Sequence, residues 1–358
     1  MSLESFVIDV IEGKKNVRAV KKFLHFSSLI FRNLIRLRHF AYDRGIFKVR
    51  KVDLPVVSVG NIVAGGTGKT PFVQLLTKEL SAHLKVGIVS RGYRSEIAKK
   101  GRTLKISAEE GPFFNADVCG DEPYFLATRL HVPVWVGKNR VKSARLAKDS
   151  QIDLVVLDDG MQHRRLHRDI EIALIDAHDP FGKGHFLPRG YLRDFPQRLR
   201  YAHLIVINHI ENEEHFEEVK AQITPFSHAP VIGTQLKVVD ESQVRGKKVG
   251  VFCGIAKPRY FIEAVQEIAE EVVDALTLSD HQKPSLQKLE AFAKLCQEQG
   301  AEALVCTEKD AVKWPVDFTT VLPLISLPAQ LEVVSGREHW HMLIEKIKQR
   351  QLQNKGRF

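Results

Sequence analysis

Short apolar runs recur along the first two thirds of the chain, and segments with helical periodicity separate them. Strands that are apolar on both faces are typical of a parallel sheet that helices cover on both sides. We therefore predict an α/β fold in which a parallel sheet is sandwiched between helices. Its strands are expected at residues 56–59, 86–90, 132–136, 152–157, 170–175 and 203–207.

A second block of the same kind begins near residue 231. It contains apolar runs at 249–252 and 303–306 and helical patterns at 260–269 and 286–298, and a final helical pattern at 339–351 closes the chain. The sequence thus predicts two α/β lobes with a cleft between them. We place the boundaries at 1–50 for an N-terminal helical region, 51–230 for the larger lobe, 231–338 for the smaller lobe and 339–358 for a C-terminal helix and tail.

The N-terminal region is amphipathic. On a helix over 14–41, basic and polar residues gather on one side and Val, Phe, Leu and Ile on the other, with only Leu29 and Arg38 misplaced. Residues 1–51 hold twelve Lys or Arg and four Asp or Glu, which accounts for +8 of the formal net charge of +10. Such a helix can lie in the plane of an anionic membrane, or it can pack on the chain's own core. We favour membrane contact, because internal packing does not require so strong a charge bias.

The rest of the composition limits the class of protein. With 44% hydrophobic and 27% charged residues, the chain is typical of a globular protein. No apolar run is long enough to predict a membrane-spanning helix, and the polar N-terminus does not resemble a secretory signal. The basic residues are concentrated in one helix, so we expect no nucleic-acid partner. The four cysteines show no metal-binding spacing and are expected to be buried thiols: Cys119, Cys253, Cys296 and Cys306.

The glycine-rich segment GNIVAGGTGKTP, residues 60–71, follows the first apolar run and opens into a helical pattern. Glycines allow backbone amides to surround phosphate groups at a helix N-terminus. In a phosphate-binding loop of this kind, the lysine contacts the β- and γ-phosphates and the following hydroxyl binds Mg²⁺. The usual pattern has glycine where this chain has Val63, and a glycine-rich loop without a ligand is the alternative. We predict a nucleoside triphosphate site formed by Gly65, Gly66, Thr67, Gly68, Lys69 and Thr70.

Two pairs of acidic residues are candidates for chemistry. Asp158 and Asp159 follow a predicted strand, as the carboxylate that holds Mg²⁺ in such sites does; a solvated turn is the alternative. Asp121 and Glu122 lie in the turn CGDEP before a helix. Phosphoryl transfer to a hydroxyl needs a carboxylate that accepts the proton of that hydroxyl, and this pair could supply it. Helix capping is the alternative explanation for the pair.

Arginine side chains suit phosphate oxygens because the guanidinium presents a fork of donors. Arg140 follows a predicted strand, and Arg189 opens a segment rich in arginine that continues to residue 200. Surface salt bridges with neighbouring aspartates are the alternative. His281 is one of fifteen histidines and carries no signal by itself.

Taken together, these segments resemble the tetraacyldisaccharide 4′-kinase family of lipid A biosynthesis in Gram-negative bacteria. The resemblance rests on GGTGKTP, SRGY, GDEP, DDGMQHR, LPRG, GIAKP, DH and TEKDAVK, which run in order and cover the chain from about residue 40 to 313. The combination of GGTGKTP, DDGMQHR and TEKDAVK is highly specific, whereas no single motif would be.

The resemblance implies transfer of the ATP γ-phosphate to the 4′-hydroxyl of tetraacyldisaccharide 1-phosphate, with ATP and Mg²⁺ as cofactors. It implies a P-loop α/β/α domain joined to a smaller lobe, and a peripheral protein on the cytoplasmic face of the inner membrane. No obligate protein partner is evident. Asp121 is implied as the general base in a dyad with His281, while Lys69 neutralises phosphate charge. Metal-binding or phosphate-organising roles are implied for Glu122, Asp158 and Asp159, and phosphate or substrate contacts for Arg140 and Arg189.

One departure from the family pattern concerns the residues after His281. The family often has a second histidine or an aromatic residue there, whereas this chain has Gln282; this puts only neighbouring substrate contacts in doubt. Two other functions stay open: a membrane-associated P-loop ATPase switch without a lipid acceptor, and a nucleic-acid-binding NTPase.

Overall fold

The computed structural model describes residues 3–93, 95–278, 285–311 and 319–355. The chain forms two compact units, one comprising Met1–Gly233 and Val333–Phe358 and the other Thr234–Glu332. It passes between them in β9 (Val231–Val238) and β14 (Ala329–Ser335), each of which begins in one unit and ends in the other.

The first unit is built around a large sheet. In the described part of the chain this sheet has ten strands in the order β14-β9-β8-β7-β1-β6-β2-β5-β3-β4. The strands from β8 to β5 run parallel, which confirms the predicted parallel α/β fold. Their bounds are β1 (Val56–Asn61), β2 (Val86–Ser90), β5 (Val134–Gly137), β6 (Leu154–Asp158), β7 (Ile170–Asp176) and β8 (Leu204–Asn208).

The edge of this sheet differs from the prediction. β3 (Thr103–Ala108) pairs antiparallel with both β5 and β4 (Gly111–Pro112). The sequence TLKISA of β3 alternates polar and apolar residues and contains no continuous apolar run. A search for continuous apolar runs therefore misses it.

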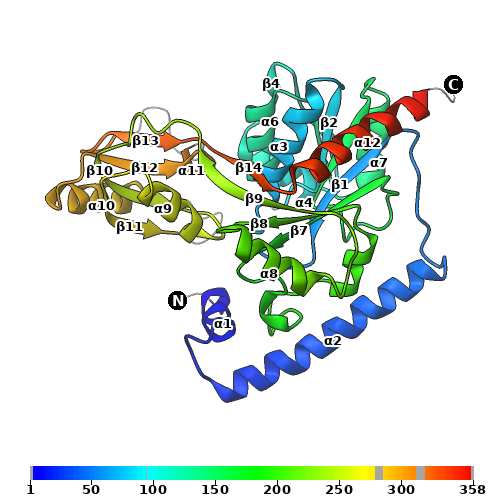
Figure 1. Ribbon diagram of the computed structural model, residues 1–358, viewed down its shortest axis with the longest axis horizontal. Helices are drawn as coiled ribbons and strands as arrows, with labels where there is room; N and C mark the ends of the chain where they lie inside the picture. Colours follow the sequence, from blue (N-terminus) through cyan, green and yellow to red (C-terminus); the bar gives the residue numbers. More distant parts are fainter. Residues whose placement is uncertain (1–2, 94, 279–284, 312–318, 356–358) are drawn as a thin grey trace. The chain divides into compact units, whose positions relative to one another are not determined.

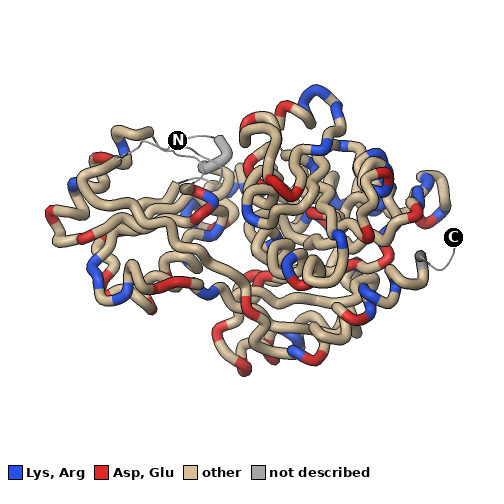
Figure 2. Tube along the Cα trace, turned by 90° about the horizontal axis from the view of Figure 1, so that it is seen from above, with Lys and Arg blue, Asp and Glu red and all other residues tan. Residues whose placement is uncertain are grey.

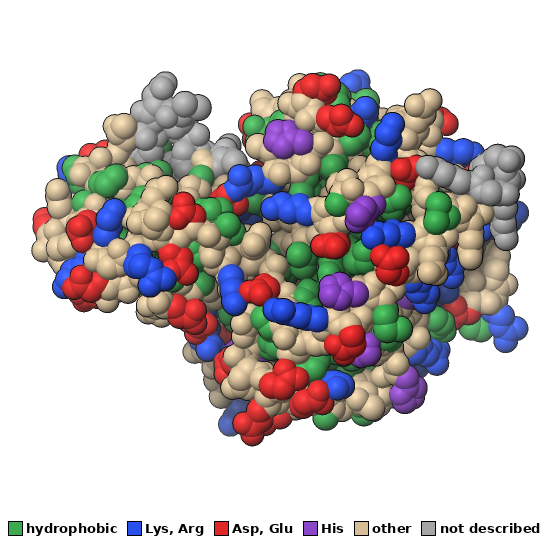
Figure 3. All heavy atoms as spheres, turned by 45° about the horizontal axis from the view of Figure 1, so that its top comes forward, with side chains coloured by type: hydrophobic (Ala, Val, Ile, Leu, Met, Phe, Trp, Pro, Cys, Tyr) green, Lys and Arg blue, Asp and Glu red, His purple; other side chains and the backbone are tan. Residues whose placement is uncertain are grey.

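Helices cover both faces of the sheet (Figure 1). They are α3 (Lys69–Ser81), α4 (Glu96–Lys99), α5 (Ala116–Cys119), α6 (Asp121–Leu130), α7 (Arg140–Lys148), α8 (Glu213–Ile223) and α12 (Arg337–Lys355), with 3-10 turns η1 (Gly182–Gly184) and η2 (Pro196–Tyr201). The C-terminal helix α12 belongs to this unit, since Trp340 packs edge-on against Phe72 of α3 with ring centroids 5.9 Å apart. Acidic and basic residues are interspersed along the trace (Figure 2), and on the face drawn in Figure 3 they lie among hydrophobic side chains.

Two helices precede the sheet, α1 (Leu3–Ile11) and α2 (Arg18–Asp43). The prediction lacks α1 because it treats the segment before residue 17 as polar, whereas the residues of Leu3–Ile11 are mostly apolar. The apolar side of α2 divides into two strips. Leu24 is buried, whereas a second strip is exposed: Phe23, Phe26, Ile30, Leu34 and Leu37. Within the described residues, no helix combines the length and apolarity needed to cross a bilayer.

The second unit contains its own parallel sheet. Its described strands, in spatial order, are β11 (Glu271–Thr277), β10 (Lys248–Cys253), β12 (Ala303–Thr307) and β13 (Leu324–Leu327). The accompanying helices are α9 (Pro258–Gln266), α10 (Leu286–Glu298) and α11 (Glu308–Ala311). The second α/β block expected from the sequence is thus present.

Candidate active site

The glycine-rich loop connects β1 to α3. Asn61 ends β1 and donates a hydrogen bond from Nδ2 to Thr67 Oγ1 at 2.6 Å. Gly68 precedes the helix with φ at +77°, and a Cβ atom there would lie 1.7 Å from Asn208 Nδ2. Glycine is therefore required at this position by the backbone and by the packing. The first amides of α3 have no partner within the helix, as phosphate binding at a helix N-terminus requires.

Val63 occupies the position where the usual loop has glycine. It is buried and forms an isolated bridge with Leu192, and the N–H of Ala64 donates to Tyr191 O at 2.7 Å. The first half of the loop is thus fixed to the segment before η2. The open turn begins only at Gly65, where φ is +103° and a Cβ atom would have no neighbour within 4 Å.

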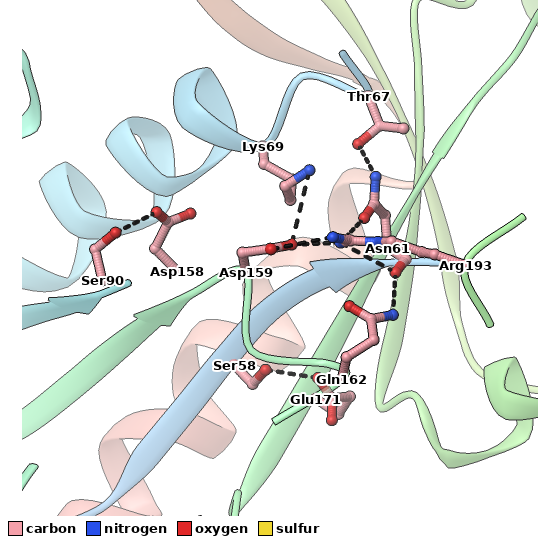
Figure 4. Close-up of polar contacts among 10 residues, drawn as sticks. All are labelled: Ser58, Asn61, Thr67, Lys69, Ser90, Asp158, Asp159, Gln162, Glu171 and Arg193. Atoms are coloured by element: carbon pink, nitrogen blue, oxygen red, sulfur yellow. Dashed lines mark hydrogen bonds and ion pairs between the residues drawn. The ribbon is translucent and has the colours of Figure 1, made fainter. Parts of the chain in front are cut away.

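Lys69, Asp159 and Arg193 form a charged cluster beside this loop (Figure 4). Lys69 Nζ lies 3.8 Å from Asp159 Oδ1, and Arg193 donates to both carboxylate oxygens of Asp159, with Nη1 3.0 Å from Oδ2. The same guanidinium contacts Asn61 Oδ1. Burial alone would raise the pKa of Asp159, but the charges of Arg193 and Lys69 outweigh it and hold that pKa well below its ordinary value. Asp159 is therefore an anion tied to two cations.

Asp158 has a different environment from its neighbour. It ends β6, is buried, and accepts a hydrogen bond from Ser90 Oγ at 3.0 Å (Figure 4). Burial, followed by the charges of Glu122 and Asp159, raises the pKa of Asp158 to about 7. A buried carboxylate with acidic neighbours is stabilised when a cation binds it. Asp158 is thus the better candidate of the pair for a metal ligand.

Asp121 and Glu122 begin α6, directly after Gly120 with φ at +91°. Glu122 acts electrostatically on both Asp158 and Lys69. The turn therefore brings its acids to the same end of the sheet as the glycine-rich loop.

Arg140 is the first residue of α7 and is buried. Burial lowers its pKa to about 10, and the carboxylate of Asp159 opposes this effect. Its Nε atom has no hydrogen-bond partner among the described residues, and neither does Arg193 Nε. Buried donors in this condition are costly unless a further acceptor satisfies them.

Among the described residues, the predicted Arg189 is not brought into the cluster. Arg189 lies beside His185, and burial together with the charge of Arg189 lowers the pKa of His185. Within the described residues, no contact joins the Arg189 side chain to Lys69 or to Asp159. His281 lies outside the described residues. The roles assigned to the predicted site residues stay predictions.

The sequence points to the arginine-rich segment but not to the arginine that makes the most contacts with the cluster. Arg193, Asn61 and Ser90 all contact the charged residues or the loop, and none belongs to the predicted site. The polar residues Asn61 and Ser90 end apolar strands, as Asp158 does. This signal could have identified both.

Comparisons with known proteins agree on one family. Residues 20–348 match the family described as tetraacyldisaccharide-1-P 4′-kinase. The chain is 32% identical over 350 residues to the tetraacyldisaccharide 4′-kinase of Halothermothrix orenii, covering 88% of this chain and 89% of the relative. It is 38% identical over 273 residues to the enzyme of the same name from Chlamydia trachomatis, covering 74% and 73%.

Among solved structures, LpxK from Aquifex aeolicus in complex with ATP superposes with a TM-score of 0.71 at 26% identity, over 92% of this chain and 99% of that one. Sequence and fold thus agree along nearly the whole length. The chain belongs to the tetraacyldisaccharide 4′-kinase family.

Proposed function

We propose that this protein transfers the γ-phosphate of ATP to the 4′-hydroxyl of tetraacyldisaccharide 1-phosphate. The observation that carries the proposal is the cluster of Lys69, Asp158, Asp159 and Arg193 beside a glycine-rich loop that opens α3. It combines fixed cations for phosphate oxygens with a carboxylate available for a metal ion, which is what phosphoryl transfer requires.

The residues present fit a bound nucleoside triphosphate. The proposed phosphate contacts are the amides of residues 65–70, the Lys69 ammonium and the guanidinium groups of the buried Arg140 and the partly buried Arg193. The unpartnered Nε atoms of these two arginines, among the described residues, are consistent with acceptors that a phosphate would provide. The solved ATP complex of LpxK from Aquifex aeolicus supports the choice of ATP.

The residues present also fit Mg²⁺. In the described part of the chain, no three His, Cys, Asp or Glu side chains gather into a metal site of their own. Mg²⁺ in kinases is usually held by one or two carboxylates together with substrate phosphates, so Asp158, Thr70 and Glu122 are sufficient protein ligands. When bound, Mg²⁺ would neutralise charge on the phosphate oxygens. We assign Asp159 to orienting Lys69 and Arg193 instead.

For the acceptor, we propose Asp121 as the general base, in a dyad with His281. Asp121 accepts the proton of the 4′-hydroxyl while the bond from that oxygen to phosphorus forms, and the bond from phosphorus to the oxygen of the leaving ADP breaks. Its place at the start of α6, next to Glu122, puts it at the end of the sheet where the phosphates are expected.

We further propose that the exposed apolar strip of α2 contacts the cytoplasmic face of the inner membrane. Phe23 and Leu37 are 68% and 63% exposed, and exposed apolar strips of this kind on a basic helix are typical of interfacial helices. The lipid acceptor would reach the site from that surface. Replacing Phe23 and Leu37 by glutamate should reduce co-sedimentation with phosphatidylglycerol vesicles, whereas Met342→Glu on α12, also an exposed apolar residue, should not. If the variant with glutamate at Phe23 and Leu37 bound the vesicles as well as Met342→Glu does, membrane contact through α2 would be contradicted.

The kinase assignment is tested by incubating the protein with γ-labelled ATP, Mg²⁺ and detergent-dispersed tetraacyldisaccharide 1-phosphate. We expect a labelled lipid, its loss in Lys69→Ala, and its retention in Lys78→Ala, which changes an exposed lysine of the same helix. Label that appears only as inorganic phosphate would instead favour the ATPase switch.

A further inference from the structure

The last turns of α2 contact a loop that also carries an active-site residue. Arg38, near the C-terminal end of α2, donates to the backbone oxygen of Gln162, in the loop that follows β6. Arg164 of the same loop returns to the helix, with Nη2 2.6 Å from Asp43 Oδ1 and Nη1 3.0 Å from His39 Nδ1. The loop after Asp159 is therefore held to α2 from two points.

A second segment is held by the same helix. His39 Nε2 lies 2.6 Å from Asp194 Oδ1, and the Asp194 side chain is 2% exposed. Because a guanidinium only donates, the contact from Arg164 makes Nδ1 of His39 an acceptor, so Nε2 carries the proton and donates to Asp194. One histidine thus joins the loop after β6 and the segment around Asp194.

Both segments meet again on the side that faces the glycine-rich loop. Arg193, the neighbour of Asp194, binds Asp159 and reaches Asn61. Gln162 Nε2 donates to Asn61 O at 2.8 Å (Figure 4). Each segment therefore contacts α2 on one side and Asn61 or the charged cluster on the other, so a displacement of α2 changes the support of Asp159 and Arg193 directly.

We propose that α2 is a positioning element for phosphoryl transfer, in which Arg38 and His39 hold the loop after β6 and the segment around Asp194 so that Asp159 and Arg193 meet. Arg38 and His39 are positioning residues that act through Gln162 and Asp194. The proposal rests on the proposed function, because the same helix carries the strip assigned to the membrane. It follows that lipid binding by α2 stabilises the loop that carries Asp159.

One of the two misplaced residues of the amphipathic pattern, Arg38, supports this inference. Arg38 interrupts the apolar side of α2, and its contact with Gln162 O gives the charge a specific role on the side of the helix that faces the protein. The strip that begins at Phe23 stays exposed. A helix that served only as an anchor would need no such contact.

The test compares Arg38→Ala and His39→Ala with Arg44→Ala. Arg44 caps the C-terminal end of the same helix, is exposed, and stacks over Phe40 without a contact to either segment among the described residues. Its replacement removes the same charge from the membrane-facing helix as Arg38→Ala does. Arg38→Lys keeps a donor for Gln162 O and serves as the conservative variant, which also covers the case in which an alanine variant fails to fold.

The first readout is hydrogen–deuterium exchange of the peptides that cover residues 159–166 and 190–196. The amides of Gly160, His163 and Arg193 are hydrogen-bonded, so their exchange reports on these segments. We expect faster exchange in both peptides for Arg38→Ala and His39→Ala, wild-type exchange for Arg44→Ala, and recovery in Arg38→Lys. Phosphatidylglycerol vesicles should slow exchange of 159–166 in the wild type and not in Arg38→Ala. Unchanged exchange in the alanine variants, or no effect of vesicles on the wild type, would overturn the proposal.

The second readout separates turnover from binding. A displaced catalytic group costs turnover while ATP still binds, so we expect kcat to fall by about 10- to 100-fold with little change in KM for ATP. Vesicle binding should match that of Arg44→Ala. A loss of kcat no greater than in Arg44→Ala would also overturn the proposal. The exchange experiment needs no lipid acceptor, so failure of the wild type to phosphorylate the lipid would refute the proposed function without deciding the role of α2.

Discussion

Replacing Arg193 by methionine removes the cation that organises the charged cluster while keeping most of the side-chain volume. Arg193 makes two hydrogen bonds with the carboxylate of Asp159 and two more with the backbone and side-chain oxygens of Asn61. Without it, Asp159 keeps an ion pair with Lys69, whose Nζ lies 3.8 Å from Oδ1. We expect Lys69 to be drawn to Asp159 and so to be withheld from the phosphates.

The size of the effect follows from how far the pair is buried. The side chains of Arg193 and Asp159 are 20% and 30% exposed. Exposed ion pairs contribute about 0–1 kcal/mol, whereas breaking a fully buried pair costs about 3–5 kcal/mol. An intermediate value of about 2–3 kcal/mol corresponds to about 30- to 150-fold, since 1.4 kcal/mol is a factor of ten. The attraction of Lys69 to the unpaired Asp159 must then be overcome before Lys69 reaches the phosphates, so we expect a loss of kcat/KM for ATP of the same order.

The assay is steady-state phosphoryl transfer by Arg193→Met at varied ATP, with thermal unfolding to confirm that the variant is folded. Arg200→Met is the matched control, because Arg200 is exposed and stacks on Tyr201 outside the cluster. A folded Arg193→Met variant within about threefold of wild type, well short of the range expected from the ion pair, would refute the reasoning that Arg193 sets the state of Asp159 and Lys69.

Three further experiments test the general base, the glycine-rich loop and the burial of the cysteines. Asp121→Asn should lower kcat by about 10²- to 10⁴-fold, the range for loss of a general base, while titration with a fluorescent ATP analogue shows unchanged affinity; near-normal turnover would remove Asp121 from the mechanism. Gly68→Ala should weaken that titration more than Gly65→Ala does: a left-handed backbone costs about 1–2 kcal/mol at either position, but only at Gly68 does the new Cβ meet Asn208. Burial raises the pKa of all four free thiols, so an aromatic disulfide reagent at about pH 8 should label them only after denaturation; rapid labelling of the native protein would contradict their burial.

Much of the fold could be predicted because its central strands are apolar on both faces. The residues of β6 and β7 are buried along their whole length, so no alternation obscures them. The edge strand β3 and the helix α1 are missed for the opposite reason, since both mix polar and apolar residues. Their position depends on tertiary packing, which buries Val10 of α1 completely.

The site could be predicted where a local motif defines it and not where the fold selects among similar residues. Lys69 and Asp158 follow from strand, loop and helix order. The choice of Arg193 over Arg189 does not follow from this order, because it depends on backbone hydrogen bonds between distant segments. The amides of Arg193 and Asp194 both donate to Ile62 O. In this arrangement the Arg193 side chain contacts Asp159 and the Asp194 side chain contacts His39. Likewise, sequence alone leaves open which aspartate serves the metal. The pairing of Asp159 with Arg193 favours Asp158.

The most direct test of the central claim is a mass spectrum of the lipid after incubation with the protein, ATP and Mg²⁺. The account predicts that tetraacyldisaccharide 1-phosphate gains one phosphate, that tandem fragmentation places it on the sugar distal to the 1-phosphate, and that phosphorus NMR assigns it to the 4′-oxygen. A lipid of unchanged mass beside accumulating ADP and inorganic phosphate would contradict a lipid kinase.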